Sequence, residues 1–204
     1  MKTLFIPAVR RNVSFNPQVL SGLPDKLHIL YSIQYKELAL AIKNYLGKRV
    51  VAFEQVLGCS KITPKAALLL IGSGRFHAIN IAISSGKQVY IYDNGKLSQI
   101  TQEEIKQHEN KEKAKLSKFL LSNNMGVLVS TKPGQSYKNP EKLIKELKKK
   151  YPDKKFYLFI ADNINLQELE NFSCDFWVNT ACPGLSLDSS KIINIDRIKN
   201  KRKK

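Results

Sequence analysis

The chain of 204 residues has no apolar run that approaches the roughly 20 residues needed for a membrane-spanning helix. Its first apolar stretch, Leu4–Ala8, is too short for a secretory signal, and no small-residue cleavage site accompanies it. We therefore expect a cytoplasmic protein without a membrane partner.

Cysteine is scarce, because the chain has only Cys59, Cys174 and Cys182. Three scattered cysteines are too few for the disulfide framework of a small secreted protein. The sequence also lacks a Cys-x-x-Cys pair, a His-Glu-x-x-His motif and a recognisable Ser/His/Asp constellation. In a reducing compartment the three thiols are structural groups, catalytic groups or metal ligands.

Acidic residues are half as numerous as basic ones, with 17 Asp and Glu against 34 Lys and Arg, and the net charge is +17. Such a balance favours partners that carry phosphate, including nucleic acid. The charge is dispersed, however, which favours solvated helix faces as its explanation. The dense runs are Lys145–Lys150 and the tail 197–204, and no aromatic residues interleave with the tail as a stacking platform would require. Nucleic acid is thus an alternative partner.

Short apolar runs alternate with segments of helical periodicity along the whole chain, which is typical of an α/β fold. We expect two similar small domains, residues 1–97 and 98–196, each a mostly parallel sheet flanked by helices, followed by a basic tail at 197–204. The similarity of the two halves suggests an internal duplication. Helices are expected at about residues 102–122, 140–150 and 165–171. The expected strands are Leu4–Ala8, Leu27–Tyr31, Arg49–Phe53, Ala66–Ile71, Gln88–Tyr92, Gly126–Ser130, Lys155–Ile160, Phe176–Thr180 and Ile192–Ile195.

Two cysteines follow expected strands. Cys59 comes after Arg49–Phe53 and Cys182 after Phe176–Thr180, in what we interpret as equivalent positions of the two halves. Ligands of parallel α/β sheets bind beyond the carboxyl ends of the strands, so the two thiols suggest a shared metal centre. The alternative is that each is a small buried hydrophobic residue. Cys174 lies before the strand, and eight extended residues separate it from Cys182 by roughly 26 Å, so we expect a core or strand-start residue rather than a third ligand.

Two loops at strand ends are candidates for binding an anion. Gly72–Arg75 opens a helix directly after a strand, so its backbone amides can hold a carboxylate, although the third glycine of a dinucleotide fingerprint is missing. In the second half, Thr131–Gln135 carries Lys132 in what we interpret as the matching loop, and a plain Pro-Gly turn is the alternative. His77 is either a ligand or acid/base group or a structural histidine. We expect His28 and His108 to be uninvolved.

Four motifs, taken in order, resemble the archaeal diphthamide synthase family over about residues 3–196: Gln55–Cys59, Gly72–His77, Val129–Gln135 and Ala181–Pro183. The resemblance implies three similar α/β domains, each supplying one cysteine to a 4Fe–4S cluster whose open iron binds S-adenosylmethionine. It further implies the activity of 2-(3-amino-3-carboxypropyl)histidine synthase. This radical transferase moves the 3-amino-3-carboxypropyl group to a histidine of translation elongation factor 2, the first step of diphthamide biosynthesis.

By this resemblance, Cys59 matches the cluster ligand of the second domain and Cys182 that of the third. The same resemblance implies a pocket for S-adenosylmethionine that is lined by Gly72, Ser73, Gly74, Arg75, His77, Thr131 and Lys132.

The sequence also departs from the family pattern. Ser73 stands where the family has an acidic residue, and Met1 coincides with the opening strand of the second domain. We therefore expect a split enzyme in which a first-domain chain supplies the third cysteine, and a homodimer partner as well. The alternatives are a non-catalytic scaffold that binds RNA or the elongation factor, and a truncated product without independent function.

Overall fold

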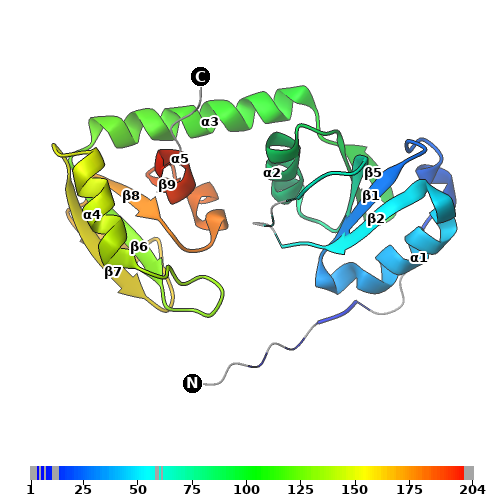
Figure 1. The fold of residues 1–204 in the computed structure, drawn as a ribbon, viewed down its shortest axis with the longest axis horizontal. Helices are drawn as coiled ribbons and strands as arrows, with labels where there is room; N and C mark the ends of the chain where they lie inside the picture. Colours follow the sequence, from blue (N-terminus) through cyan, green and yellow to red (C-terminus); the bar gives the residue numbers. More distant parts are fainter. Residues whose placement is uncertain are drawn as a thin grey trace. The chain divides into compact units, whose positions relative to one another are not determined.

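The computed structural model describes residues 4, 6, 8–10, 14–57, 60 and 62–199. Contacts divide the chain into two units, Met1–His108 and Glu109–Lys204, and each unit has a sheet of its own (Figure 1). The expected fold class, α/β with two mostly parallel sheets flanked by helices, is confirmed. The division falls within a long helix rather than at residue 97, because Ile100 belongs to the core of the first unit and Glu104 pairs with Arg75 of that unit.

The first unit is built on a five-stranded sheet of order β2-β1-β3-β4-β5, in which β5 alone runs antiparallel to its neighbour. Its elements are η1 (Pro17–Leu20), β1 (Leu27–Tyr31), η2 (Ile33–Tyr35), α1 (Lys36–Leu46), η3 (Gly47–Arg49), β2 (Val50–Gln55), β3 (Ala67–Ile71), α2 (Arg75–Ser85), β4 (Val89–Asp93), β5 (Lys96–Gln99) and the start of α3 (Gln102–Leu121).

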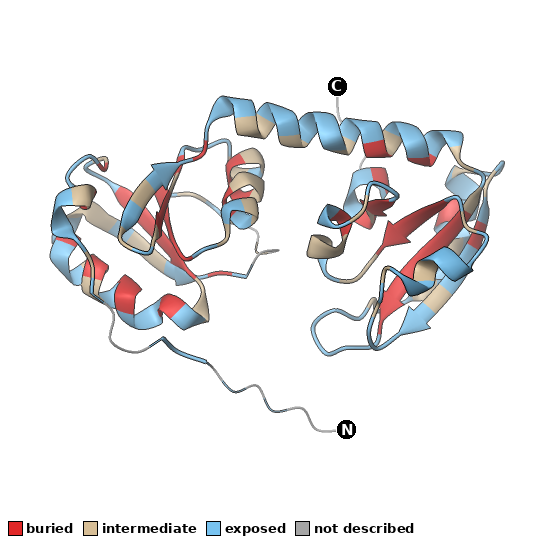
Figure 2. Cartoon of the chain, turned by 180° about the vertical axis from the view of Figure 1, so that it is seen from behind, coloured by how far each residue is buried: buried red, intermediate tan, exposed pale blue. Residues whose placement is uncertain are grey.

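The two faces of this sheet carry separate cores, because successive side chains of a strand point to opposite faces. Leu27, Ile29 and Tyr31 pack with α1, whereas Leu30 packs with α2 on the other face. All five residues of β1 are buried, as expected for a strand covered on both faces. Figure 2 shows the buried residues concentrated in the strands of each unit.

The second unit is built on a four-stranded parallel sheet of order β7-β6-β8-β9. Helix α4 and the end of α3 pack on one face of this sheet, while the segment before β8 covers the other. Its elements after α3 are β6 (Asn124–Ser130), α4 (Pro140–Lys150), β7 (Lys155–Ala161), η4 (Glu168–Asn171), β8 (Phe176–Asn179), η5 (Pro183–Leu187), β9 (Ile192–Asn194) and α5 (Ile195–Lys199).

The strand orders show how the halves correspond. The order β2-β1-β3-β4 of the first sheet matches β7-β6-β8-β9 of the second. Cys59 follows β2, whose counterpart is β7, whereas Cys182 follows β8, whose counterpart is β3. The interpretation that the two cysteines occupy equivalent positions is therefore wrong, and so is the matching of Thr131–Gln135, after β6, with Gly72–Arg75, after β3. The sequence shows that a residue follows a strand, but only the strand order in the sheet shows which strand of the other unit corresponds to it.

Three further expectations need correction. The described residues Leu4, Ile6 and Ala8 are exposed and belong to no strand of the first sheet. Strand β5 lies in a segment where no strand was expected, and its pairing with β4 determines its conformation. The helix expected at 165–171 is the single 3-10 turn η4. No helix in the described part of the chain is long and apolar enough to cross a membrane.

Gly126 of β6 lies directly against the indole ring of Trp177. The two residues are paired in the β6–β8 ladder, and a Cβ atom at position 126 would lie 2.1 Å from Cζ3 of the indole. Trp177 is fully enclosed, with Phe159 packed edge-on at a centroid distance of 4.9 Å. The absence of a side chain at position 126 therefore makes room for this aromatic cluster.

We predict that Gly126→Ala lowers the free energy of unfolding by about 1–3 kcal/mol, because a methyl group there must displace a buried ring. Thermal unfolding followed by circular dichroism measures the change. Gly22→Ala is the matched control, since no atom lies within 4 Å of the added Cβ, and it should change stability by less than about 0.5 kcal/mol. Equal melting curves for Gly126→Ala and the unmodified chain would contradict the packing argument.

His28 is a buried titratable group in the central strand β1. Its side chain is 3 % exposed, and Nε2 lies 2.9 Å from a carboxylate oxygen of Glu54, outside hydrogen-bonding geometry. Burial lowers the pKa of His28 from its ordinary value of 6.5; Glu54 opposes this shift and Lys65 adds to it. The folded chain therefore holds His28 neutral at a pH where the unfolded chain already binds a proton.

We predict that His28 makes the folded state less stable as the pH falls. Below 6.5 the unfolded state binds more protons at this residue, so stability is lost until the pH reaches the lowered pKa of the folded state. Urea unfolding from about pH 7 to about pH 5 measures the slope. His28→Leu removes the titrating group and should flatten that slope. The same slope in both proteins would show that other groups cause the acid sensitivity.

Candidate functional site

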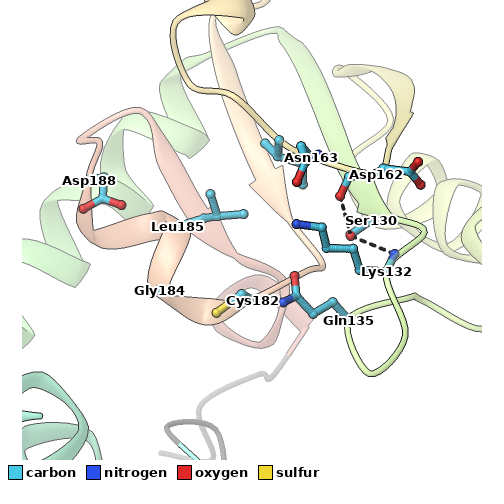
Figure 3. Close-up of a pocket in the computed structure, with 10 residues that line it drawn as sticks. Ser130, Lys132, Gln135, Asp162, Asn163, Cys182, Gly184, Leu185 and Asp188 are labelled. Carbon is cyan, nitrogen blue, oxygen red and sulfur yellow. Dashed lines mark hydrogen bonds between the residues drawn. The ribbon is translucent and has the colours of Figure 1, made fainter. Parts of the chain in front are cut away.

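A cavity of about 340 Å³ lies at the carboxyl edge of the second sheet (Figure 3). The order β7-β6-β8 places a switch point beside β6, where consecutive connections leave the sheet in opposite directions, and ligands of α/β sheets bind at such points. Three loops, following β6, β7 and β8, supply the lining. The lining residues are Ser130, Lys132, Gln135, Asp162, Asn163, Ile164, Cys182, Gly184, Leu185 and Asp188.

The loop after β6 carries the predicted residues Thr131 and Lys132. Buried Ser130 fixes its start, because its hydroxyl accepts a hydrogen bond of 3.1 Å from the Lys132 N–H. The Thr131 hydroxyl donates to a carboxylate oxygen of Asp162, which joins this loop to the one after β7. The Lys132 side chain extends into the cavity (Figure 3), and no ion pair between described residues involves it. Its ammonium group is therefore available to an anion.

Cys182 stands at the start of η5 and lines the same cavity as Lys132 and Gln135 of the β6 loop (Figure 3). Its side chain is a free, exposed thiol. Its carbonyl oxygen, by contrast, accepts hydrogen bonds from Asn179 Nδ2 at 2.8 Å and from the Leu185 N–H at 3.1 Å. The backbone is thus fixed from inside while the sulfur faces outward. Such a thiol suits a metal ligand, because deprotonated cysteine sulfur binds iron and zinc.

A complete metal site cannot be read from the described residues, among which no three His, Cys, Asp or Glu side chains come together as a metal-binding group. Cys59, the other predicted ligand, lies outside the described residues. Cys174 precedes β8, packs against the Trp177 side of the sheet and has its pKa raised by burial. Cys182 is therefore the cysteine that the described structure offers as a ligand.

The cavity contains acidic groups as well as the predicted Lys132, and the sequence analysis did not predict the acidic groups. Asp162 follows β7 and Asp188 follows η5, so two carboxylates line the same space as the Lys132 ammonium. Asn163 and Gln135 add amide groups. A ligand with a carboxylate and an ammonium group, such as an amino acid, can find a partner for each charge here. The position of Asp162 and Asn163 directly after an apolar strand was the available signal.

The predicted residues of the Gly72–His77 loop lie in the first unit. Gly72 has φ of +150°, and its N–H donates to the Tyr92 carbonyl at 3.1 Å. Ser73 is exposed at the turn before α2. The exposed His77 folds back over Gly74, where a Cβ atom would lie 2.4 Å from Nδ1 of the ring. A side chain at position 74 would have to displace this ring.

Arg75 is engaged inside the first unit. Its Nε and Nη2 donate to the two carboxylate oxygens of Glu104 at 2.6 and 2.9 Å, and Nη2 also lies 3.4 Å from the Gln99 carbonyl. The hydrogen bond from Arg75 lowers the pKa of Glu104 to about 2, with a further contribution from the Thr101 N–H at the start of α3. The guanidinium therefore links α2 to α3 and is not directed at a ligand.

Comparison with known proteins gives consistent matches. The family model described as "Putative diphthamide synthesis protein" matches residues 2–192. The 2-(3-amino-3-carboxypropyl)histidine synthase of Methanocaldococcus jannaschii is 30 % identical over 205 residues, which cover 92 % of this chain and 57 % of that protein. The protein of the same name from Pyrococcus horikoshii is 33 % identical over 139 residues, which cover 66 % of this chain and 40 % of the relative.

The fold has a solved counterpart as well. The crystal structure of Dph2 from Pyrococcus horikoshii with a 4Fe–4S cluster superposes with a TM-score of 0.75 at 25 % identity, covering 88 % of this chain and 58 % of that one. The chain thus spans 57 % of the Methanocaldococcus relative and a smaller share of the Pyrococcus one. Because the family model matches nearly the whole sequence, the chain belongs to the diphthamide synthesis protein family.

Proposed function

We propose that this chain is part of a 2-(3-amino-3-carboxypropyl)histidine synthase. The proposed reaction transfers the 3-amino-3-carboxypropyl group of S-adenosylmethionine to a histidine of translation elongation factor 2, by a radical mechanism that depends on a 4Fe–4S cluster. The observation that carries the proposal is the free thiol of Cys182 beside Lys132 at a strand-end cavity. Its support is the fold shared with a relative whose crystal structure holds such a cluster.

The proposed cluster ligands in this chain are Cys182 and Cys59. Three thiolates hold such a cluster and leave one iron open. Cys174 is not proposed as the third ligand, because it precedes β8 and packs against the Trp177 side of the sheet. We assign the third ligand to a polypeptide of the first-domain type, outside these 204 residues. When bound, the cluster supplies the electron that breaks the bond between the sulfonium sulfur and the aminocarboxypropyl carbon.

The residues of this chain bind and orient the reacting molecule. Lys132 pairs with its α-carboxylate, and the carboxylates of Asp162 and Asp188 accept hydrogen bonds from its α-ammonium. Thr131 holds Asp162 in place. Fixing both ends of the amino acid part sets the position of the carbon–sulfur bond, which is how orientation accelerates a reaction.

The Gly72–His77 loop is also proposed to bind S-adenosylmethionine, through its backbone amides. Gly72, Ser73 and Gly74 lead into α2, an eleven-residue helix whose amino end favours negative charge. Arg75 keeps its contact with Glu104 and holds this loop, and the exposed His77 faces solvent with its ring free to contact a ligand. The proposed protein partners are elongation factor 2, the first-domain polypeptide and a second copy of the chain.

We predict that the chain, co-purified without oxygen with a first-domain chain, binds a cluster through Cys59 and Cys182. Cys59→Ala and Cys182→Ala should each reduce the iron–sulfur absorbance to background, because two thiolates hold a cluster poorly. Iron and sulfide content per complex measures the loss.

Cys174→Ala is the matched control, since this thiol packs against the hydrophobic face around Trp177. It should retain the cluster. Full clusters in both Cys59→Ala and Cys182→Ala would overturn the ligand assignment. Salt-dependent RNA binding without any cluster would instead favour a scaffold role.

We predict that Lys132→Met weakens the binding of S-adenosylmethionine by about 10- to 100-fold, because a hydrogen bond to a charged group contributes about 1.5–3 kcal/mol. Equilibrium dialysis against the cluster-loaded complex measures the dissociation constant. Lys138→Met makes the same change of charge on the neighbouring turn and should leave binding unchanged, because Lys138 lines a different cavity. Equal affinities for Lys132→Met and the unmodified complex would exclude the proposed carboxylate contact.

A further inference from the structure

The Cys182 loop is held from inside by a pair of asparagine side chains. Asn179 ends β8 and Asn194 ends β9, and the two residues are partners in the parallel ladder between these strands. Asn179 is 1 % exposed. An amide buried to this extent destabilises the fold unless it is hydrogen-bonded, so its contacts indicate why asparagine stands there.

The Asn179 amide uses its oxygen and both N–H groups. Its Oδ1 accepts from the Ala181 N–H at 2.9 Å. Its Nδ2 donates to the Cys182 carbonyl at 2.8 Å and to Asn194 Oδ1 at 2.7 Å. The Asn179 side chain therefore hydrogen-bonds to the backbone of both Ala181 and Cys182. A reversed amide would place its oxygen against two other oxygens, so the network determines its orientation.

Asn194 extends the same hydrogen-bond network along η5. Its Nδ2 donates to the Pro183 carbonyl at 3.1 Å and to the Ser186 hydroxyl at 2.9 Å, and that hydroxyl donates to the Pro183 carbonyl at 3.0 Å. The buried Lys115 of α3 donates to the Ser186 carbonyl. The carbonyl groups of Cys182, Pro183 and Ser186 are thus all satisfied by polar groups on the inner side of the loop.

The same loop leaves its thiol free. Cys182 is exposed, lines the cavity and has its backbone fixed (Figure 3). A loop that is ordered through its main chain can present a ligand atom without further ordering when the metal binds. Groups that orient a metal ligand raise metal affinity for this reason, even when they do not touch the metal.

We propose that Asn179 and Asn194 are positioning residues that direct the sulfur of Cys182 toward the cavity for iron ligation. The inference rests on the proposed function, because it takes Cys182 to be a cluster ligand. In this proposal, the affinity of Cys182 for iron depends on the asparagine side chains behind the loop as well as on the thiol itself.

The first test needs no cluster. Asn179→Asp keeps the shape of the side chain and the acceptor for the Ala181 N–H, but it places an oxygen against the Cys182 carbonyl and Asn194 Oδ1. In the full chain, we expect the Leu185 amide, which donates to the Cys182 carbonyl, to exchange its hydrogen about tenfold faster. The Ala181 amide should stay protected. Residue-resolved hydrogen exchange by NMR measures both.

Asn194→Asp should have a smaller effect, because it preserves the acceptor for Asn179 Nδ2 and the Ser186 hydroxyl can turn to donate to the new carboxylate. This variant keeps the proposal testable if Asn179→Asp does not fold. Asn110→Asp, on the exposed face of α3, makes the same charge change away from the loop and should alter neither amide. Unchanged exchange at Leu185 in both network variants would overturn the proposal.

The second test uses the cluster-loaded complex with the first-domain chain. Transfer of iron to a chelator should be about 10- to 100-fold faster with Asn179→Asp, the range typical of groups that orient a metal ligand. Gly126→Ala serves as a destabilised control that leaves the network intact. If iron release follows the loss of thermal stability equally in Gly126→Ala and Asn179→Asp, the asparagines have a structural role only and the proposal fails. If the unmodified complex holds no cluster, the proposed function fails, while the exchange experiment still decides whether the asparagines hold the loop.

Discussion

Parallel pairing of β6 with a strand on each side is the constraint on which the candidate site depends. The ladder pairs Ser130 with Ala161 on one side but ends at Leu128 with Asn179 on the other. The carbonyl of Leu128 then accepts from both the N–H and the hydroxyl of Thr180, at 3.0 and 2.7 Å, which closes the ladder. Because β8 ends before β6 does, the following loop has room to place a thiol beside the β6 loop.

The buried strands could be predicted from the sequence because their composition leaves little choice. Leu27–Tyr31 and Gly126–Ser130 are mostly apolar, interrupted only by His28 and Ser130, and they form the interior strands β1 and β6. Strand β5 could not be predicted in this way, since its residues are largely exposed and its conformation depends on pairing with β4. Leu4, Ile6 and Ala8 show the converse error, because they are apolar yet lie exposed and outside any strand.

The candidate site was partly predictable for the same reason. Cys182 and Lys132 could be identified because each follows an apolar run directly. Asp188 could not, because it joins the cavity through the path of η5. The engagement of Arg75 by Glu104, 29 residues further along the chain, depends on how α3 meets α2, which local patterns do not contain. Strand order likewise decided that Cys59 and Cys182 follow non-equivalent strands.

The contact between Gly126 and Trp177 has a practical consequence for spectroscopy. Trp177 is the one tryptophan of the chain, and it lies in β8, three residues before the loop that begins at Thr180. Selectively excited tryptophan emission therefore reports on the second unit alone. Eight tyrosines and the backbone signal sample both units. Comparing the two signals during denaturation would tell whether the two units lose their structure together or one after the other.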